Sequence, residues 1–400
     1  FGSRPSGSQR LPLAMRSVMM TSSSLLESPA GRPHEQLKHV FFVRHGESEW
    51  NRGQETWAMD AVLKMARRRD HPLSKEGVQQ ARRLEGDILR AMALRRSEAP
   101  AEGSEAELEA RFLAADVVLC SPLTRAVQTA TVGLRPLLAP QSTSPAPRRE
   151  PLRLRLAADI RERRNLGGLD TVGTCPGQSV PGRVQRCLEK AVGADLASEY
   201  YGIIDAIDYD DVEEQWWDAR PESPAAVEQR MGSFVGLLRA LPQEQDSVIA
   251  IGHSHFFREV FRRYASADAG DFRTKVLSNC GVVAATFSFG EGLGTRIVAQ
   301  RLIFSSALVE RPGPLLSVLA GPAGPRWAVL SSLSIFVAEC VRRLDLHATA
   351  AAVAAAGMGL LLAQALQRWL LPWRPEAVVL LWVLCSLLVR TLERAGGCAW

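Results

Sequence analysis

Cysteine is scarce in this chain and follows no pattern. The seven cysteines are scattered, with no CxxC pair and no grouping with histidine at the spacing of a zinc site. Such a distribution excludes a disulfide framework and a structural zinc module. It favours reduced thiols and a cytosol-like compartment.

Long blocks of one charge are also absent. Lysine and arginine number 48 against 43 aspartate and glutamate, and the longest basic run is residues 67–69. Because a dedicated nucleic-acid binder concentrates basic residues on one face or segment, we expect no nucleic-acid partner. Charged residues are 23% and hydrophobic residues 46% of the chain, which excludes a wholly disordered protein.

The 400 residues divide by composition into four parts. Residues 1–36 lack hydrophobic periodicity and suit a disordered segment or, with arginine and serine but no acid before Glu27, an organelle-targeting segment. Residues 37–305 have the patterning of a folded domain. A linker over residues 306–326 and a hydrophobic helical tail over residues 327–400 complete the predicted organisation.

Hydrophobic patterns in the domain predict alternating strands and helices. Short apolar runs predict strands at 39–44, 116–120, 153–157, 247–252, 282–288 and 296–303. Spacing near 3.6 predicts helices at 74–95, with Ser74 as N-cap, at 123–134, and over much of 180–245. We interpret 97–110 as an acidic loop. The alternation predicts an α/β fold, with a mostly parallel central sheet and helices on both faces.

Polar side chains follow three of the predicted strands. His45 follows the first strand, Ser121 the second and His253 the strand at 247–252. Ligands of such sheets sit beyond the carboxyl ends of the strands, so we expect these residues to converge. Gly46 permits a tight turn into a helix whose N-terminus attracts anions. Arg44 can bind two phosphate oxygens at once through its guanidinium, and His45 is then a candidate nucleophile toward phosphorus.

Five motifs in this order resemble the histidine phosphatase superfamily, the phosphoglycerate mutase-like group. They are VRHGESEWN at 43–51, DHPLSKEGVQQA at 70–81, CSPLTRAVQTA at 120–130, IRERRNLGG at 160–168 and IAIGHSHFFRE at 249–259. Two weaker segments agree, PESPAAVEQR at 221–230 and SNCGVV at 278–283. The resemblance covers about residues 37–304 and implies a phosphoglycerate mutase-like fold.

The resemblance implies a role for each matching side chain. Three residues match catalytic positions: the nucleophile that becomes phosphohistidine, the general acid and a second histidine, which are His45, Glu162 and His253. Three match phosphate-binding positions, namely Arg44, Asn51 and Arg125. Arginine and histidine supply the charge that a phosphoryl group in transfer needs, so we expect no metal and no cofactor.

Two of these assignments keep a structural alternative. Glu162 lies in a run of charged residues at 161–164 that also suits a solvated surface. Asn51 follows a predicted helix start, where asparagine also serves as a helix cap.

Two departures from the family pattern concern the reaction. Mutases of the family carry an FTGW-like segment soon after the RHG motif, which residues 52–74 lack, and a tyrosine shortly after the acid, where this chain has Asn165 and Leu166. We therefore predict hydrolysis of a phosphomonoester, on a phosphorylated small molecule or a phosphoprotein. Mutase-type phosphoryl transfer and a catalytically silent membrane adaptor are the alternatives.

The tail contains uncharged runs at 346–367 and 377–389. About 20 apolar residues span a bilayer core, and the first run reaches that length. The sequence predicts a membrane-inserted hairpin or two to three short spans, with the catalytic domain facing the cytosol. A buried helical module and a read-through tail are the alternatives.

Overall fold

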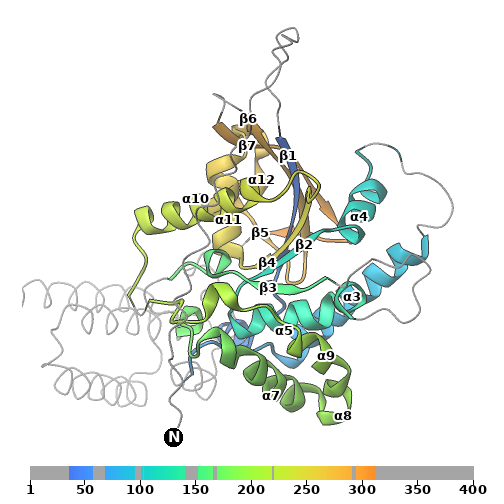
Figure 1. Cartoon of the computed structure of the whole chain (residues 1–400), viewed down its shortest axis with the longest axis vertical. Coiled ribbons are helices and arrows are strands. Elements are labelled where there is room, and N and C mark those ends of the chain that lie inside the picture. Colours follow the sequence, from blue (N-terminus) through green and yellow to red (C-terminus); the bar gives the residue numbers. More distant parts are fainter. Residues whose placement is uncertain are drawn as a thin grey trace, which may run out of the picture.

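The computed structural model describes residues 36–56, 68–94, 101, 103–139, 152–164, 169–218, 220–290 and 294–310 (Figure 1). The predicted tail at 327–400, most of the linker and all but the last residue of segment 1–36 lie outside the described residues. None of the described helices is long and apolar enough to cross a membrane. The membrane interpretation of the tail therefore stays a prediction.

A six-stranded mixed sheet forms the centre of the described domain, with strand order β3-β2-β4-β1-β6-β7. Four strands are mutually parallel: β1 (Gln36–Arg44), β2 (Val117–Cys120), β3 (Leu154–Leu156) and β4 (Ser247–Gly252). The other two pair in antiparallel fashion, β6 (Val282–Gly290) with β1 and β7 (Gly294–Ile303) with β6.

All six predicted strands are present and the α/β fold is confirmed. The parallel prediction holds for four strands, whereas β6 is antiparallel to β1 and β7 is antiparallel to β6, which it follows after only the short connection at 291–293. A connection of that length permits only antiparallel neighbours.

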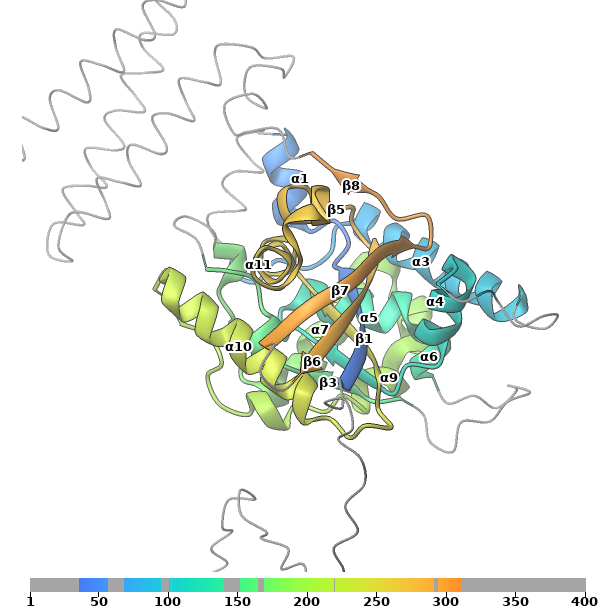
Figure 2. The same cartoon turned by 90° about the horizontal axis from the view of Figure 1, so that it is seen from above.

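Helices cover both faces of the sheet, as Figure 2 shows. Side chains alternate along β1, so Phe41 and Val43 enter one buried cluster while Val40 and Phe42 enter the other. The first cluster includes residues of α3 (Lys75–Leu94), α4 (Glu105–Leu113), α5 (Thr124–Gly133), α6 (Arg135–Leu138), α7 (Val180–Val192), α8 (Ala194–Ala197) and α9 (Tyr201–Asp205). The second includes residues of α10 (Pro224–Ala240) and α11 (Ser254–Tyr264).

Smaller elements lie around this framework. Helix α1 (Glu49–Thr56) follows the first strand, and α12 (Asp271–Thr274) follows α11. A two-stranded antiparallel pair is formed by β5 (Val276–Leu277) and β8 (Leu308–Val309).

The prediction of an acidic loop over 97–110 was wrong from residue 105 onward, where α4 begins. Ser104 is its N-cap and accepts a hydrogen bond from the Glu107 N–H at 3.2 Å. Glu107 then pairs with Arg111 one turn later. The acids are concentrated at the start of the helix, where they interact favourably with its dipole, so a composition typical of a loop was compatible with a helix.

The turn after β1 contacts the start of α3 through a hydrogen bond and close backbone packing. Ser74 caps this helix as predicted, accepting from the Gly77 N–H at 3.0 Å, and it also donates to the carboxylate of Glu47. A methyl group added at Gly77 would lie 2.0 Å from the Glu47 carbonyl oxygen. Only glycine therefore allows the helix to approach the turn this closely.

This contact leads to a stability prediction. Gly77→Ala should lower the free energy of unfolding by about 2–3 kcal/mol or more, because backbone must move to admit the new methyl group. Gly86→Ala, in the same helix with open space around it, should be neutral or stabilising by up to about 1 kcal/mol. Urea denaturation of both variants checks this, and equal effects would contradict it.

Candidate phosphoryl-transfer site

The carboxyl ends of β1, β4 and β2 meet at one edge of the sheet, as the sequence predicts. The backbone N–H of His45 donates to the Gly252 carbonyl at 3.0 Å, and that of Ser121 donates to the Ile251 carbonyl at 2.9 Å. Residues far apart in the sequence are thereby held side by side at the point where each strand ends.

His45 lies buried at this edge, with 4% of its surface exposed. Its Nδ1 lies 2.6 Å from the Gly46 carbonyl oxygen. A carbonyl oxygen only accepts, so this contact assigns the ring proton to Nδ1 and leaves the lone pair on Nε2. Burial, followed by the charges of Arg125 and Arg44, lowers the pKa of His45 well below its usual value. The imidazole is therefore neutral and able to act as a nucleophile.

Arg125 places its guanidinium against that lone pair. It is 1% exposed, and its Nε donates to His45 Nε2 at 3.3 Å. Its Nη1 donates to the Asp170 carbonyl oxygen at 2.6 Å, and its Nη2 lies 3.5 Å from Asp170 Oδ2. A full positive charge is thus held next to the nitrogen that would attack phosphorus.

The first turn of α5 positions Arg125, and Asp70 fixes that turn. Asp70 accepts hydrogen bonds from the Thr124 N–H at 2.8 Å and from the Thr124 hydroxyl at 2.6 Å. Arg183 pairs with the same carboxylate at 3.2 Å. The motif DHPLS therefore supplies the cap of a helix that begins about 50 residues later in the chain.

His253 stands beside His45, with ring centroids 4.9 Å apart. Its Nε2 lies 2.8 Å from the Ser121 hydroxyl oxygen, and the residue is fully buried. Burial, followed by the charges of Arg125 and His45, lowers the pKa of His253 well below its usual value. The site therefore pairs two neutral imidazoles with a buried guanidinium.

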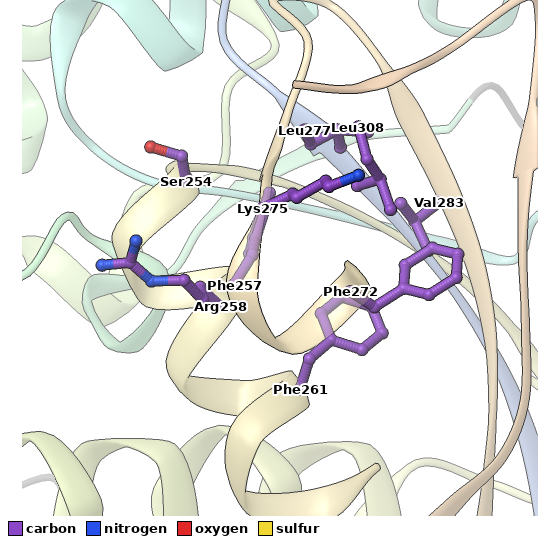
Figure 3. Close-up of a pocket in the computed structure, with 9 residues that line it drawn as sticks. All are labelled: Ser254, Phe257, Arg258, Phe261, Phe272, Lys275, Leu277, Val283 and Leu308. Carbon is purple, nitrogen blue, oxygen red and sulfur yellow. The ribbon is translucent and has the colours of Figure 1, made fainter. Parts of the chain in front are cut away.

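Arg44 contributes charge from the end of β1. Its Nη1 donates to the Leu277 carbonyl oxygen at 2.6 Å. Leu277 also lines a crevice between α11, α12 and the β5–β8 pair, which Figure 3 shows. Phe261 and Phe272 make that crevice largely apolar, so an apolar surface adjoins the polar site.

Glu162 is buried, with 6% of its surface exposed, so it does not belong to a solvated charge run. Its Oε1 accepts from the Arg163 N–H at 2.8 Å and from the Phe256 N–H at 3.2 Å. Phe256 lies in the first turn of α11, directly after His253, so this helix start connects the carboxylate to the two histidines. Both hydrogen bonds that the described residues make to Glu162 end on Oε1, and Oε2 is the oxygen available to a substrate.

Asn51 takes part in a helix start. Its Oδ1 accepts from the Ser48 N–H at 3.2 Å and from the Ser48 hydroxyl at 2.8 Å, while its own N–H donates to that hydroxyl. This reciprocal pattern is a capping box. The contacts of Asn51 are those of the structural alternative, and its predicted phosphate contact stays a prediction.

Asp170 is a site residue that the sequence analysis did not single out. It lies in the 3₁₀ turn Leu169–Thr171 and contacts Arg125 through both its carbonyl and its carboxylate. Burial raises the pKa of Asp170, Arg125 lowers it, and the nearby charge of Glu162 raises it. Asp170 belongs to no motif whose spacing signals such a contact, so it could not be selected from the sequence alone. Among the described residues, no group of three or more metal-ligating side chains occurs.

The two lowered histidine pKa values predict how stability depends on pH. Below about pH 6.5 the unfolded chain protonates His45 and His253 while the folded chain does not, so the free energy of unfolding should fall as the pH falls. Each histidine contributes at most about 1.4 kcal/mol per pH unit. His253→Gln should flatten the dependence between pH 7.5 and 5, as measured by urea denaturation. An unchanged slope would contradict the lowered pKa.

Comparison with known proteins finds one family model that is similar to part of the chain. The model of the histidine phosphatase superfamily (branch 1) matches residues 40–95. No curated protein is significantly similar to the chain.

Two solved structures illustrate the structural similarity. A mycobacterial glucosyl-3-phosphoglycerate phosphatase shares 15% identity over 68% of this chain and 100% of its own, with a TM-score of 0.36. A phosphoglycerate mutase from Bacillus anthracis shares 16% identity over 66% of this chain and 93% of its own, with a TM-score of 0.35. At such identities and scores these structures say nothing about the reaction of this chain. The matched segment holds Arg44, His45 and the whole of α3, and over these residues the chain is similar to the histidine phosphatase superfamily.

Proposed function

We propose that this protein hydrolyses phosphomonoesters through a phosphohistidine intermediate on His45, without a metal ion. Similarity to the histidine phosphatase superfamily over residues 40–95 supports phosphoryl transfer or hydrolysis in general. One observation carries the finer proposal: the neutral, buried His45 has its Nε2 lone pair facing the guanidinium of Arg125 at 3.3 Å. An anionic phosphoryl group that replaces this contact at Nε2 would meet a nucleophile and a compensating charge together.

In the first step, Nε2 of His45 forms a bond to phosphorus as the ester P–O bond breaks. The equatorial oxygens of the transferring group carry the negative charge in the transition state. Arg125 and Arg44 compensate that charge, and both are already in place before substrate binds. Most of the rate acceleration then comes from positioning and electrostatics rather than from covalent chemistry of the protein.

Glu162 is proposed to act first as the general acid and then as the general base. The protonated carboxyl gives its proton to the leaving ester oxygen in the first step. The resulting carboxylate takes a proton from water as water attacks the phosphohistidine, the P–N bond breaks, and inorganic phosphate leaves. Its buried position at the N-terminus of α11, with Oε2 available, supports this role.

We favour hydrolysis over mutase chemistry because a mutase must retain its intermediate while the substrate reorients. The segment that follows the RHG motif in the family's mutases has no counterpart at 52–74. The substrate is a phosphorylated small molecule or a phosphoprotein.

Replacement of the nucleophile tests the proposal directly. On a panel of phosphomonoesters, His45→Ala in the full chain should lose at least about 10³-fold in kcat, since the covalent route is closed. Acid-quenched wild-type enzyme should carry an acid-labile phosphoryl group that the variant lacks. His39→Ala, on the same strand but at its other end, should retain activity. Equal turnover by wild type and His45→Ala would refute the proposal.

The general-acid role makes a separate prediction about leaving groups. Glu162→Gln should slow phosphohistidine formation from alkyl phosphates about 10²–10⁴-fold, because an alkoxide needs a proton to leave. Formation from p-nitrophenyl phosphate should change far less, since nitrophenolate leaves without one. Rapid-quench kinetics on the two substrates measure the difference. A uniform loss would assign Glu162 to another role.

A further inference from the structure

A second buried ion pair lies outside the groups used above. Arg230 of α10 is 5% exposed and binds Glu222, which precedes that helix, through two hydrogen bonds of 2.9 and 2.8 Å. Removing two charges from water is costly unless the geometry is good and the remaining donors and acceptors are also satisfied. The other hydrogen bonds of Arg230 and Glu222 show which part of the chain this ion pair holds in place.

The remaining donors of Arg230 go to the backbone just before Glu162. Its Nη1 donates to the carbonyl oxygens of Asp159 at 2.8 Å and Arg161 at 2.7 Å. A planar guanidinium is well suited to this task, because it can bind a carboxylate on one edge and carbonyl oxygens on another.

The remaining capacity of Glu222 goes to the backbone just after Glu162. Its Oε2 accepts from the Arg164 N–H at 2.9 Å, and its own N–H donates to the Arg164 carbonyl at 3.2 Å. Its Oε1 also accepts from the Arg161 side chain at 2.8 Å. The pair therefore binds the backbone on both sides of Glu162.

A third contact reaches the other partner of the carboxylate. The guanidinium of Arg230 lies 4.8 Å from the centroid of the Phe256 ring. The N–H of Phe256 is one of the two donors to Glu162. Arg230 thus contacts both the segment that carries Glu162 and the residue that receives its carboxylate.

We propose that the Glu222–Arg230 pair positions Glu162 for proton transfer, and this inference rests on the function proposed above. The segment 158–164 follows the end of β3, beyond the ladder of the sheet, so its backbone is held by the 3₁₀ turn Ala158–Ile160 and by the contacts with Glu222 and Arg230 rather than by strand pairing. Proton transfer requires heavy atoms within hydrogen-bond reach, and a displacement of about 1 Å can cost about 10²-fold in rate. Glu222 and Arg230 are positioning residues, since they act through Glu162.

The test uses the full chain with Arg230→Lys and Glu222→Gln. Lysine keeps the charge of Arg230 but cannot bind a carboxylate and two carbonyl groups at once. Each variant should lower kcat on an alkyl phosphate by about 10–100-fold with KM nearly unchanged, and should leave turnover of p-nitrophenyl phosphate close to wild type. Arg135→Lys is the matched control, because it changes an arginine that joins two helices through Glu85 and should affect neither substrate.

A double variant separates positioning from general stability. Glu162→Gln with Arg230→Lys should be no slower than Glu162→Gln alone on the alkyl phosphate, because the residue being positioned is already disabled. Multiplying losses, or equal losses on both substrates with a raised KM, would overturn the positioning role while leaving the phosphatase proposal standing. A wild-type chain inactive on both substrates would instead overturn the proposed function and the positioning role with it.

Discussion

The guanidinium of Arg125, buried against the imidazole of His45, is the interaction on which the rest of the site depends. A charge held at 1% exposure must be compensated and its helix must be held in place. Asp170 supplies the compensation, and Asp70 holds the first turn of α5. Burial and then the same charge lower the pKa of the neighbouring imidazoles, which favours their neutral form. One arrangement thus supplies both the nucleophile and the phosphate-binding group of the proposed mechanism.

Glycine residues allow the turn after His45 to pack closely against α3. The turn carrying Gly46 packs against α3, whose Gly77 admits no side chain because the Glu47 carbonyl occupies the space. The N–H of Gly46 donates to the Thr129 hydroxyl, which in turn donates to the Arg125 carbonyl. The motifs around residues 45, 77 and 125 are therefore parts of one packed unit, which explains why they occur together.

Much of the framework could be predicted from sequence because it depends on local patterns. Apolar runs located all six strands of the sheet, and the polar residues after three of them do converge. The Ser74 cap could be read from residue type and spacing. Contacts made across the fold could not. Asp170 belongs to no motif, and although the segment at 221–230 contains Glu222 and Arg230, its resemblance does not indicate which groups the pair contacts. The acidic start of α4 was misassigned because acids suit both loops and helix N-termini.

The two buried arginines of the described domain, Arg125 and Arg230, differ in what their donors bind. This difference agrees with the roles proposed for them, phosphate binding for Arg125 and positioning of Glu162 for Arg230. Arg230 binds a carboxylate twice and two backbone carbonyls, so its donors serve fixed protein groups. Arg125 directs one donor at the Nε2 of His45 and another at the Asp170 carbonyl oxygen, and its contact with the Asp170 carboxylate is longer, at 3.5 Å. An arginine that faces a lone pair and a distant carboxylate can exchange partners with an incoming anion. One bound bidentately to a carboxylate and to two backbone carbonyls just before Glu162 has its donors committed to fixed protein groups, as the proposed positioning role requires.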